Sequence, residues 1–364
     1  MKELNRTRYQ GFDVARALAI FGMVVVNFKI AMNADFGNAF WLSFAGLFEG
    51  RASALFVILA GVGLSFLSDK ARRSGSLELI AQTRLKIIKR ALLLIIIGLL
   101  YTPIWEADIL HFYGVYFFIA AALITLSDRG LLIMAAVITA AFPLLLLGFD
   151  YEQNWNWNTL KYEHFWTFDG MVRHILFNGF HPVFPWLAFL ILGMWLARQD
   201  LQSSVFKGRL ALIAVGILGL CEFGSAALQD LLGSDSLTWG LSPEEVSFLF
   251  STSVIPPMPQ YVLSAASSAV LIILACLAVS ERLASPRLIF CLSKTGQLSL
   301  SLYVAHVVVG MGILEALGYL ENQSIEVSLF SAMVFCLTGS LFSVLWLRHF
   351  NTGPLEALFK KLST

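Results

Sequence analysis

The sequence predicts an all-α protein: a polytopic integral membrane helix bundle with about ten transmembrane helices and both termini in the cytoplasm. Three observations support this fold class. Hydrophobic residues make up 58% of the 364 positions and charged residues only 13%, and the mean hydropathy is +0.75. A soluble domain of that composition could not cover its surface with polar groups. The apolar residues also form runs that match the thickness of a bilayer, and basic residues follow every second run.

The predicted spans follow from the length of roughly 20 apolar residues that a helix needs to cross the hydrocarbon core. The first begins after Asp13 and Arg16, and the second carries small residues that permit close helix approach. The sixth follows Pro182 and Pro185, which suit the start of a helix. In chain order the spans are 14–33, 50–68, 86–103, 109–127, 130–149, 182–198, 209–229, 261–280, 297–317 and 327–347.

Basic residues set the predicted orientation. A cluster of Lys and Arg residues crowds the connection between the second and third spans: Lys70, Arg72, Arg73, Arg84, Lys86, Lys89 and Arg90. The other alternate ends carry Arg6, Arg8, Arg198, Lys207, Arg209, Arg282, Arg287, Lys294, Arg348, Lys360 and Lys361. The connections between them are acidic or neutral, so the positive-inside rule places the basic ends and both termini in the cytoplasm.

We expect a single domain over residues 1–364, with two outer loops near residues 150–180 and 230–260 that could each cover a site. The first loop is rich in aromatic side chains, which serve at a bilayer either as interface anchors or as sugar-stacking platforms. These are Tyr151, Trp155, Trp157, Tyr162, Phe165 and Trp166. The composition gives no support for a nucleic-acid partner. The spacing of the four cysteines predicts neither a metal site nor a disulfide framework.

Polar residues inside apolar spans mark candidate sites, because burying a charge in a bilayer costs several kcal/mol unless it is paired or hydrated. Asp13 and Arg16 are three residues apart and can pair at the entry of the first span. Asn27 lies about three helical turns beyond Arg16, on nearly the same stripe. In an equally simple interpretation, Asp13 is an N-cap and Asn27 forms an interhelical hydrogen bond.

Arg51 stands at the predicted outer end of the second span, against the positive-inside bias. It is therefore expected to pair with an acid or to bind an anion. Gly61 and the other small residues of this span indicate close helix packing, which by itself marks no site.

Asp108 and His111 begin the fourth span and are three residues apart. At this spacing the carboxylate could orient the imidazole as a general base. The same residues also fit an ordinary helix start, with Asp108 as the N-cap and His111 at the membrane interface.

Two further histidines stand in apolar surroundings. His181 precedes the sixth span, where it is either a functional group or an interfacial ring beside Trp186. His306 lies deep inside the ninth predicted span and must form a hydrogen bond there, in a structural or a functional role. No role is predicted for His164, His174 or His349.

Several segments resemble the bacterial members of the heparan-α-glucosaminide N-acetyltransferase-like multipass membrane acyltransferases. They are F-D-V-A-R-A-L-A-I-F-G-M-V-V-V-N at 12–27, G-R-A-S-A-L-F-V-I-L-A-G-V-G at 50–63, D-I-L-x-x-Y-G-V at 108–115, H-P-V-F-P-W-L-A-F-L-I-L-G-M at 181–194, L-S-L-Y-V-x-H at 300–306 and G-P-L-E-A-L at 353–358. The resemblance implies that an acetyl or other acyl group passes from a cytosolic acyl-CoA to a hydroxyl or amine on the far side of the membrane. In the lysosomal branch a histidine in the outer connection after the first span is implicated in this transfer, whereas residues 28–49 contain none.

Such an enzyme needs a base, oxyanion donors and a basic entrance for the CoA phosphates. The predicted base is His181 or His111, with Asp108 orienting His111 and His306 in reserve. Asn27 or Arg51 could stabilise the oxyanion. The entrance is assigned to Arg72, Arg73, Arg84 and Arg90, with Asp13 and Arg16 also on the cofactor side. No metal is expected.

The expected partners are membrane lipids, acyl-CoA and a glycan or lipid-linked acceptor, in the bacterial cytoplasmic (inner) membrane. The sequence also permits a homo-oligomer. Two alternatives stay open: a transporter or flippase for a small or lipid-linked amphiphile, which could use the same intramembrane polar residues, and a non-catalytic scaffold.

Overall fold

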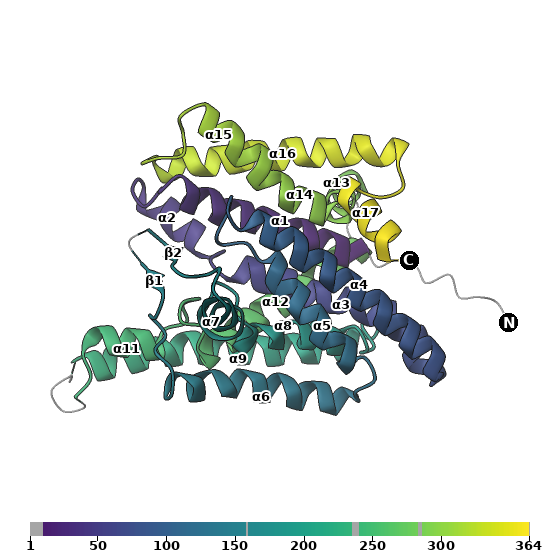
Figure 1. Ribbon diagram of the computed structural model, residues 1–364, viewed down its shortest axis with the longest axis horizontal. Coiled ribbons are helices and arrows are strands. Elements are labelled where there is room, and N and C mark those ends of the chain that lie inside the picture. Colours follow the sequence, from purple (N-terminus) through teal and green to yellow (C-terminus); the bar gives the residue numbers. More distant parts are fainter. Residues whose placement is uncertain (1–9, 158, 235–239, 283–285, 364) are drawn as a thin grey trace. The chain divides into compact units, whose positions relative to one another are not determined.

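A computed structural model describes residues 10–157, 159–234, 240–282 and 286–363 (Figure 1). Arg6, Arg8 and part of the predicted 230–260 loop lie outside these residues. The described chain is helical apart from loops and a two-stranded antiparallel sheet that pairs Trp155 with Tyr162. It forms two compact units, Met1–Phe56 with Ala269–Leu358 (the terminal unit) and Val57–Ser268 with Phe359–Thr364 (the central unit).

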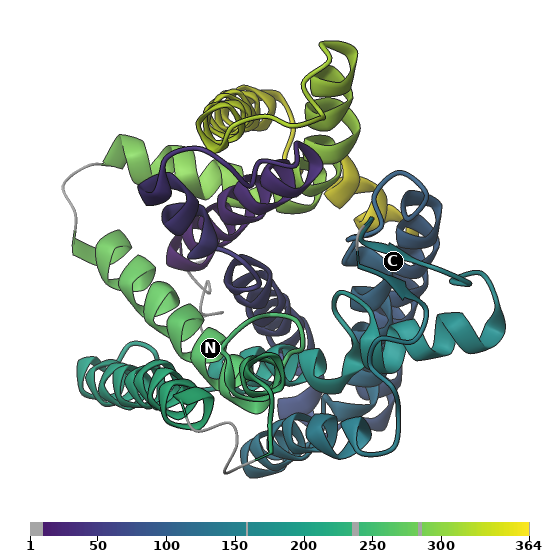
Figure 2. The same cartoon turned by 90° about the vertical axis from the view of Figure 1, so that its left-hand side faces the viewer.

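The terminal unit contains most of the first and last helices. They are α1 (Gln10–Ala31), α2 (Ala39–Gly46), α13 (Pro286–Gln297), α14 (Ser299–Ala305), η2 (His306–Met311), α15 (Gly312–Ala316) and α16 (Ile325–His349). Both ribbon views show α1, in purple, running along the green and yellow C-terminal helices (Figures 1 and 2), and α1 packs against α13 and α16.

The central unit holds the elements between them. They are α4 (Leu77–Tyr101), α5 (Leu110–Leu123), α6 (Asp128–Leu146), β1 (Trp155–Asn156), β2 (Lys161–Tyr162), α7 (Phe168–Arg173), η1 (His174–Asn178), α8 (Val183–Leu196), α9 (Ser204–Ser234) and α11 (Pro243–Phe250). The chain passes between the units within α3 (Arg51–Ser74), α12 (Pro259–Arg282) and α17 (Pro354–Ser363).

The helices confirm the predicted fold class, an all-α polytopic membrane bundle. Within the described residues, seven segments are long and apolar enough to cross a bilayer, or eight if α7–η1 and α8, bent by 52°, form one broken span. The predicted spans 86–103 and 109–127 fall on α4 and α5. α5 has only 14 residues, and four basic side chains lie between residues 84 and 90 of α4. The count of ten and the cytoplasmic termini stay predictions, as does the single domain.

Side-chain caps explain several helix starts. Ser76 accepts the amide of Leu79 at 3.4 Å at the start of α4, and Ser127 accepts the amide of Gly130 at 3.1 Å at the start of α6. α11 begins with a capping box in which Ser242 and Glu245 exchange hydrogen bonds. Such contacts satisfy amides that have no partner within the helix.

α14 has no cap of its own and receives one from the far end of the chain. Glu356 Oε1 accepts the amides of Leu300 at 2.9 Å and Ser301 at 3.1 Å, and its Oε2 accepts the Ser301 hydroxyl at 2.5 Å. The G-P-L-E-A-L segment therefore places a carboxylate at a helix N-terminus, where the helix dipole favours negative charge.

We expect Glu356→Ala to destabilise the protein by roughly 1.5–3 kcal/mol, the size of a charge-assisted hydrogen bond, because α14 loses its cap. Thermal unfolding of the purified protein in detergent measures this effect. Glu315→Ala is the matched control, since Glu315 is an exposed acid on α15. Equal melting temperatures for Glu356→Ala and the control would contradict the capping role.

Candidate functional site

The predicted pair of Asp108 and His111 is in contact at the start of α5. Asp108 Oδ2 lies 3.1 Å from His111 Nδ1, and Asp108 is 0% and His111 1% exposed. A carboxylate beside Nδ1 favours the tautomer that carries the proton on Nδ1, which leaves the lone pair of the neutral ring on Nε2. His111 Nε2 is buried and has no hydrogen-bond partner among the described residues. The ring therefore presents an oriented and unoccupied basic nitrogen.

Asp108 also caps the helix start, although the N-cap position itself is Ile109 and His111 is buried rather than interfacial. The same Oδ2 accepts the backbone amides of Leu110 at 2.9 Å and His111 at 3.3 Å. Capping and orienting are thus two functions of one carboxylate. His111 is fixed against its neighbour helix as well, because α4 and α5 pack along their lengths (Figure 1), and a Cβ on Gly98 would lie 2.8 Å from His111 Cα. Only glycine allows this approach.

Three histidine rings surround Phe112. The centroid of the Phe112 ring lies 4.1 Å from that of His111, 5.1 Å from that of His174 and 5.9 Å from that of His181. The rings of His111 and His174 are stacked, with centroids 5.7 Å apart. Nδ1 of His174 and Nδ1 of His181 are both buried without a hydrogen-bond partner in the described part of the chain. The central unit therefore gathers three imidazoles in an apolar setting.

His181 is fixed by contacts on both sides. Its backbone carbonyl accepts the hydroxyl of Tyr116, which is fully buried. Its ring stands edge-on to Trp186 at 4.5 Å between centroids. Trp186 is 0% exposed, so it is a core residue of the central unit rather than an interface anchor.

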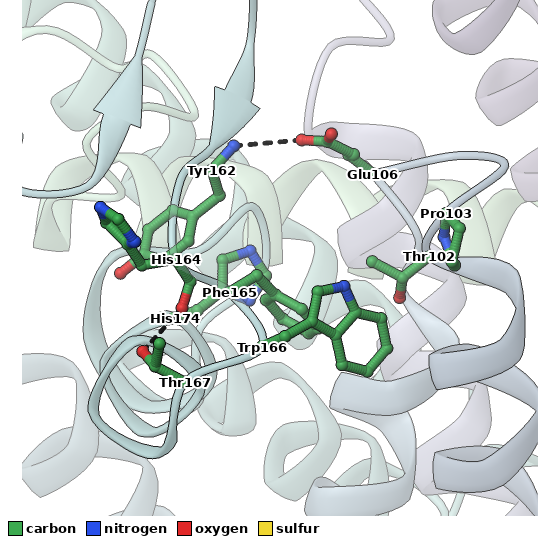
Figure 3. Close-up of a pocket in the computed structure, with 9 residues that line it drawn as sticks. All are labelled: Thr102, Pro103, Glu106, Tyr162, His164, Phe165, Trp166, Thr167 and His174. Atoms are coloured by element: carbon green, nitrogen blue, oxygen red, sulfur yellow. Dashed lines mark hydrogen bonds between the residues drawn. The ribbon is translucent and has the colours of Figure 1, made fainter.

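A cavity of about 370 Å³ opens beside the histidines (Figure 3). Its lining combines aromatic rings with a carboxylate, hydroxyls and two imidazoles: Thr102, Pro103, Glu106, Tyr162, His164, Phe165, Trp166, Thr167 and His174. Most of these residues come from the predicted outer loop near 150–180. That loop thus forms much of a cavity wall.

Most of the predicted loop aromatics pack inward. Tyr162 and Phe165 are buried and stand edge-on to the His174 ring, with centroids 4.6 Å and 4.9 Å away, whereas Trp166 is 62% exposed. The Tyr162 hydroxyl donates to Asn178 Oδ1 at 2.9 Å. Burial raises the pKa of Tyr162, which keeps the hydroxyl protonated as a donor.

The second predicted loop packs against the first. Tyr151 meets Phe248 of α11, with ring centroids 5.9 Å apart. Met258, after the Pro256–Pro257 pair, joins the same apolar cluster as Tyr151. The two outer loops therefore support each other within the central unit.

In the terminal unit, Asn27 and His306 form a second polar pair. Asn27 Nδ2 lies 2.8 Å from His306 Nε2, and His306 Nδ1 contacts the backbone carbonyl of Tyr303. The carbonyl requires a proton on Nδ1, so Nε2 accepts from the Asn27 amide. His306 is 1% exposed and opens the π-helical turn η2. The interhelical hydrogen bond expected of Asn27 is confirmed.

The arginines assigned to the phosphate entrance have protein partners. Arg72 and Arg73 both pair with Asp69, at 3.0 Å and 2.9 Å. Arg84 donates to the carbonyls of Ala121 and Ala122 near the end of α5, at 3.0 Å and 3.4 Å. These contacts place Arg84 as a cap of α5. The structure brings Arg72 and Arg73 together on one carboxylate.

The remaining predicted residues lie on three helices, α1, α3 and α4. Arg90 donates to the Ser363 hydroxyl at 3.1 Å. Asp13 and Arg16 form the predicted pair at 2.8 Å, but Asp13 lies inside α1 and does not act as its N-cap. Arg51 is half-buried at the first residue of α3.

His174 was predicted to lie in a loop and to have no role. His174 is 2% exposed and opens the π-helical turn η1. A signal was present, because His174, Asn178 and His181 follow one another at intervals of four and three residues in an apolar stretch, the spacing of one helix face. No three His, Cys, Asp or Glu side chains converge as metal ligands among the residues described.

Comparison with known proteins places the chain in a family. Residues 8–218 match the family described as "Heparan-alpha-glucosaminide N-acetyltransferase, catalytic", and residues 232–364 match one described as "Protein of unknown function (DUF418)". A protein of Escherichia coli (strain K12), "Uncharacterized protein YeiB", is 25% identical over 396 aligned positions that cover 96% of this chain and 95% of the relative. The first match includes Asn27, Asp108 and the three histidines around Phe112, and it spans more than half of the sequence. The chain therefore belongs to the membrane acetyltransferase-like family of the heparan-alpha-glucosaminide N-acetyltransferase catalytic domain.

Proposed function

We propose that this protein is a membrane-embedded acyltransferase that moves an acetyl or other acyl group from acyl-CoA to a hydroxyl or amine of a glycan or lipid-linked acceptor. The observation that carries the proposal is the Asp108–His111 pair, in which the carboxylate orients the ring and leaves Nε2 buried and without a hydrogen-bond partner in the described chain. An oriented imidazole of this kind is the usual general base of acyl transfer.

The reaction requires few groups. The base withdraws a proton from the acceptor while the acceptor oxygen or nitrogen attacks the thioester carbonyl, and the C–S bond then breaks. The proton passes to the CoA sulfur, which leaves as the thiol. Hydrogen-bond donors that face the carbonyl oxygen stabilise the charge it gains. His181, in the same unit, is the alternative base of this proposal.

The phosphates of acyl-CoA would meet the basic connection between α3 and α4. Arg73 supports this assignment because its side chain is 68% exposed while it pairs with Asp69. Arg72 and Arg90 belong to the same stretch of chain. This end faces the cytoplasm in the predicted orientation, with the acceptor at the outer face of a bacterial inner membrane.

We expect acetyl-CoA to bind with micromolar affinity, and the triple variant Arg72→Gln, Arg73→Gln, Arg90→Gln to bind at least about tenfold more weakly, since each charge-assisted hydrogen bond contributes roughly 1.5–3 kcal/mol. Calorimetry on detergent-purified protein measures both. Arg129→Gln is the matched control, an exposed arginine on the same predicted side. Absence of binding by folded wild-type protein, for acetyl-CoA and for longer acyl-CoAs, would refute the acyltransferase.

One observation favours a second candidate, a transporter or flippase. The α7–η1 segment and α8 meet at a 52° bend, and together they could form one broken span. Broken helices of this kind hold substrates in many transporters. Binding of acyl-CoA separates the two functions, because a transporter of amphiphiles has no need of it.

A further inference from the structure

His174 combines burial with access to the cavity. The ring is 2% exposed, and its Nδ1 has no hydrogen-bond partner within the described residues. It begins a π-helical turn, closed by the hydrogen bond of 3.0 Å from the Gly179 amide to the His174 carbonyl. Such turns are frequent at functional sites. A buried ring nitrogen without a hydrogen-bond partner is costly, so its presence here indicates a function.

The cavity distinguishes the three histidines around Phe112. Its lining includes His174 but neither His111 nor His181. Figure 3 shows His174 and Phe165 between Tyr162 and Trp166, with Glu106 hydrogen-bonded to the backbone amide of Tyr162 at 3.1 Å. A ligand in the cavity would thus contact His174 directly, whereas His111, stacked against the His174 ring, lies outside the lining.

We propose that this cavity is the acceptor site and that His174 is a catalytic residue that takes the proton from the acceptor, with the Asp108–His111 pair behind it. This inference rests on the proposed acyltransferase and moves the proton transfer from His111 to His174, with His111 as a positioning residue stacked against that ring. As the acceptor oxygen or nitrogen bonds to the acyl carbon, its proton moves to the imidazole of His174. The C–S bond breaks, and the sulfur of the departing CoA receives that proton, so the ring returns to its neutral state.

The lining restricts the acceptor. A cavity of about 370 Å³ with aromatic walls and a carboxylate suits a ring-sized group that carries hydroxyls or an amine. Glu106 and Thr102 offer hydrogen-bond acceptors in its lining, and the exposed Trp166 ring offers a stacking surface.

Chemical rescue tests the assignment. The assay follows the release of CoA from acetyl-CoA by purified full-length protein, with an extract of Escherichia coli membrane lipids and glycans as the acceptor source. His174→Ala is expected to lower kcat by about 10²–10⁴-fold, the contribution of a general base. Added imidazole should raise the kcat of His174→Ala at least about tenfold, because the space left by the missing ring adjoins the cavity. The same imidazole should not rescue His111→Gln, whose ring lies outside the lining.

The outcomes separate this inference from the proposed function. Turnover by wild-type protein together with full activity of folded His174→Ala or His174→Gln would refute the role of His174 and leave the acyltransferase standing. A loss in His174→Ala that imidazole does not reverse would also count against the proton transfer and favour a packing role. No turnover by wild-type protein would overturn both. His349→Ala, an exposed position at the end of α16, should behave as wild type.

Discussion

Replacing His111 with glutamine is expected to lower the rate of acetyl transfer by about 10²–10⁴-fold, the usual contribution of a general base or of a group in its proton path. Glutamine keeps the approximate size and polarity of the ring but cannot carry the proton. The measurement is CoA release from acetyl-CoA by purified protein. His349→Gln serves as the control, because its side chain is exposed and lies outside the histidine cluster.

Asp108 provides an internal test of the same prediction. Asp108→Asn removes the charge that orients His111 while leaving an oxygen that can accept the Leu110 and His111 amides. If Asp108 acts through His111, the double variant should be about as slow as His111→Gln alone, since residues that act as a unit are not additive. Additive losses would show that the two residues act separately. Full activity of folded His111→Gln would exclude the ring from the reaction.

Gly61→Val is expected to destabilise the protein strongly. A Cβ on Gly61 of α3 would lie 2.9 Å from both the Leu190 carbonyl carbon and the Met194 amide nitrogen of α8, and Gly193 faces it with equally little room. Backbone atoms cannot rotate away as side chains do, so the helices must separate. Overpacking of this kind costs about 1–3 kcal/mol or more.

The measurement is thermal unfolding in detergent, with a drop of several degrees expected. Gly216→Val on α9 introduces the same side chain where a Cβ would meet no atom within 4 Å, so it should melt close to wild type. Equal melting temperatures for the two variants would mean that α3 and α8 do not depend on this contact. Because α8 also carries Trp186 beside His181, the Gly61 variant should lose activity as well.

The local pairs could be predicted because they lie within one helical turn. Asp108 with His111, and Asp13 with Arg16, are each three residues apart, and helix geometry alone brings them together. Gly61 was likewise predicted to lie at a close helix approach. The sequence could not decide between capping and orienting for Asp108, and the structure shows that one oxygen serves both.

The contacts between distant segments could not be predicted. Asn27 and His306 are 279 residues apart in the chain, and spacing carries no information over that distance. No role was predicted for His174 because its segment was expected to be part of an outer loop. The segment instead forms a helix and a π-helical turn that packs against α8. The contact of Arg84 with the carbonyl of Ala121 near the end of α5 could not be predicted either.

The sequence by itself determined the membrane class, the helical fold and the family, because bilayer length and apolar composition are properties of contiguous segments. It also determined which polar residues stand in apolar surroundings. Only the tertiary structure decided which of them share a site. It gathers His111, His174 and His181 around Phe112 and opens a cavity beside one of them. The physical reason is that partners in a helix bundle are chosen by packing across helices, where small residues and buried hydrogen bonds set the contacts independently of distance along the chain.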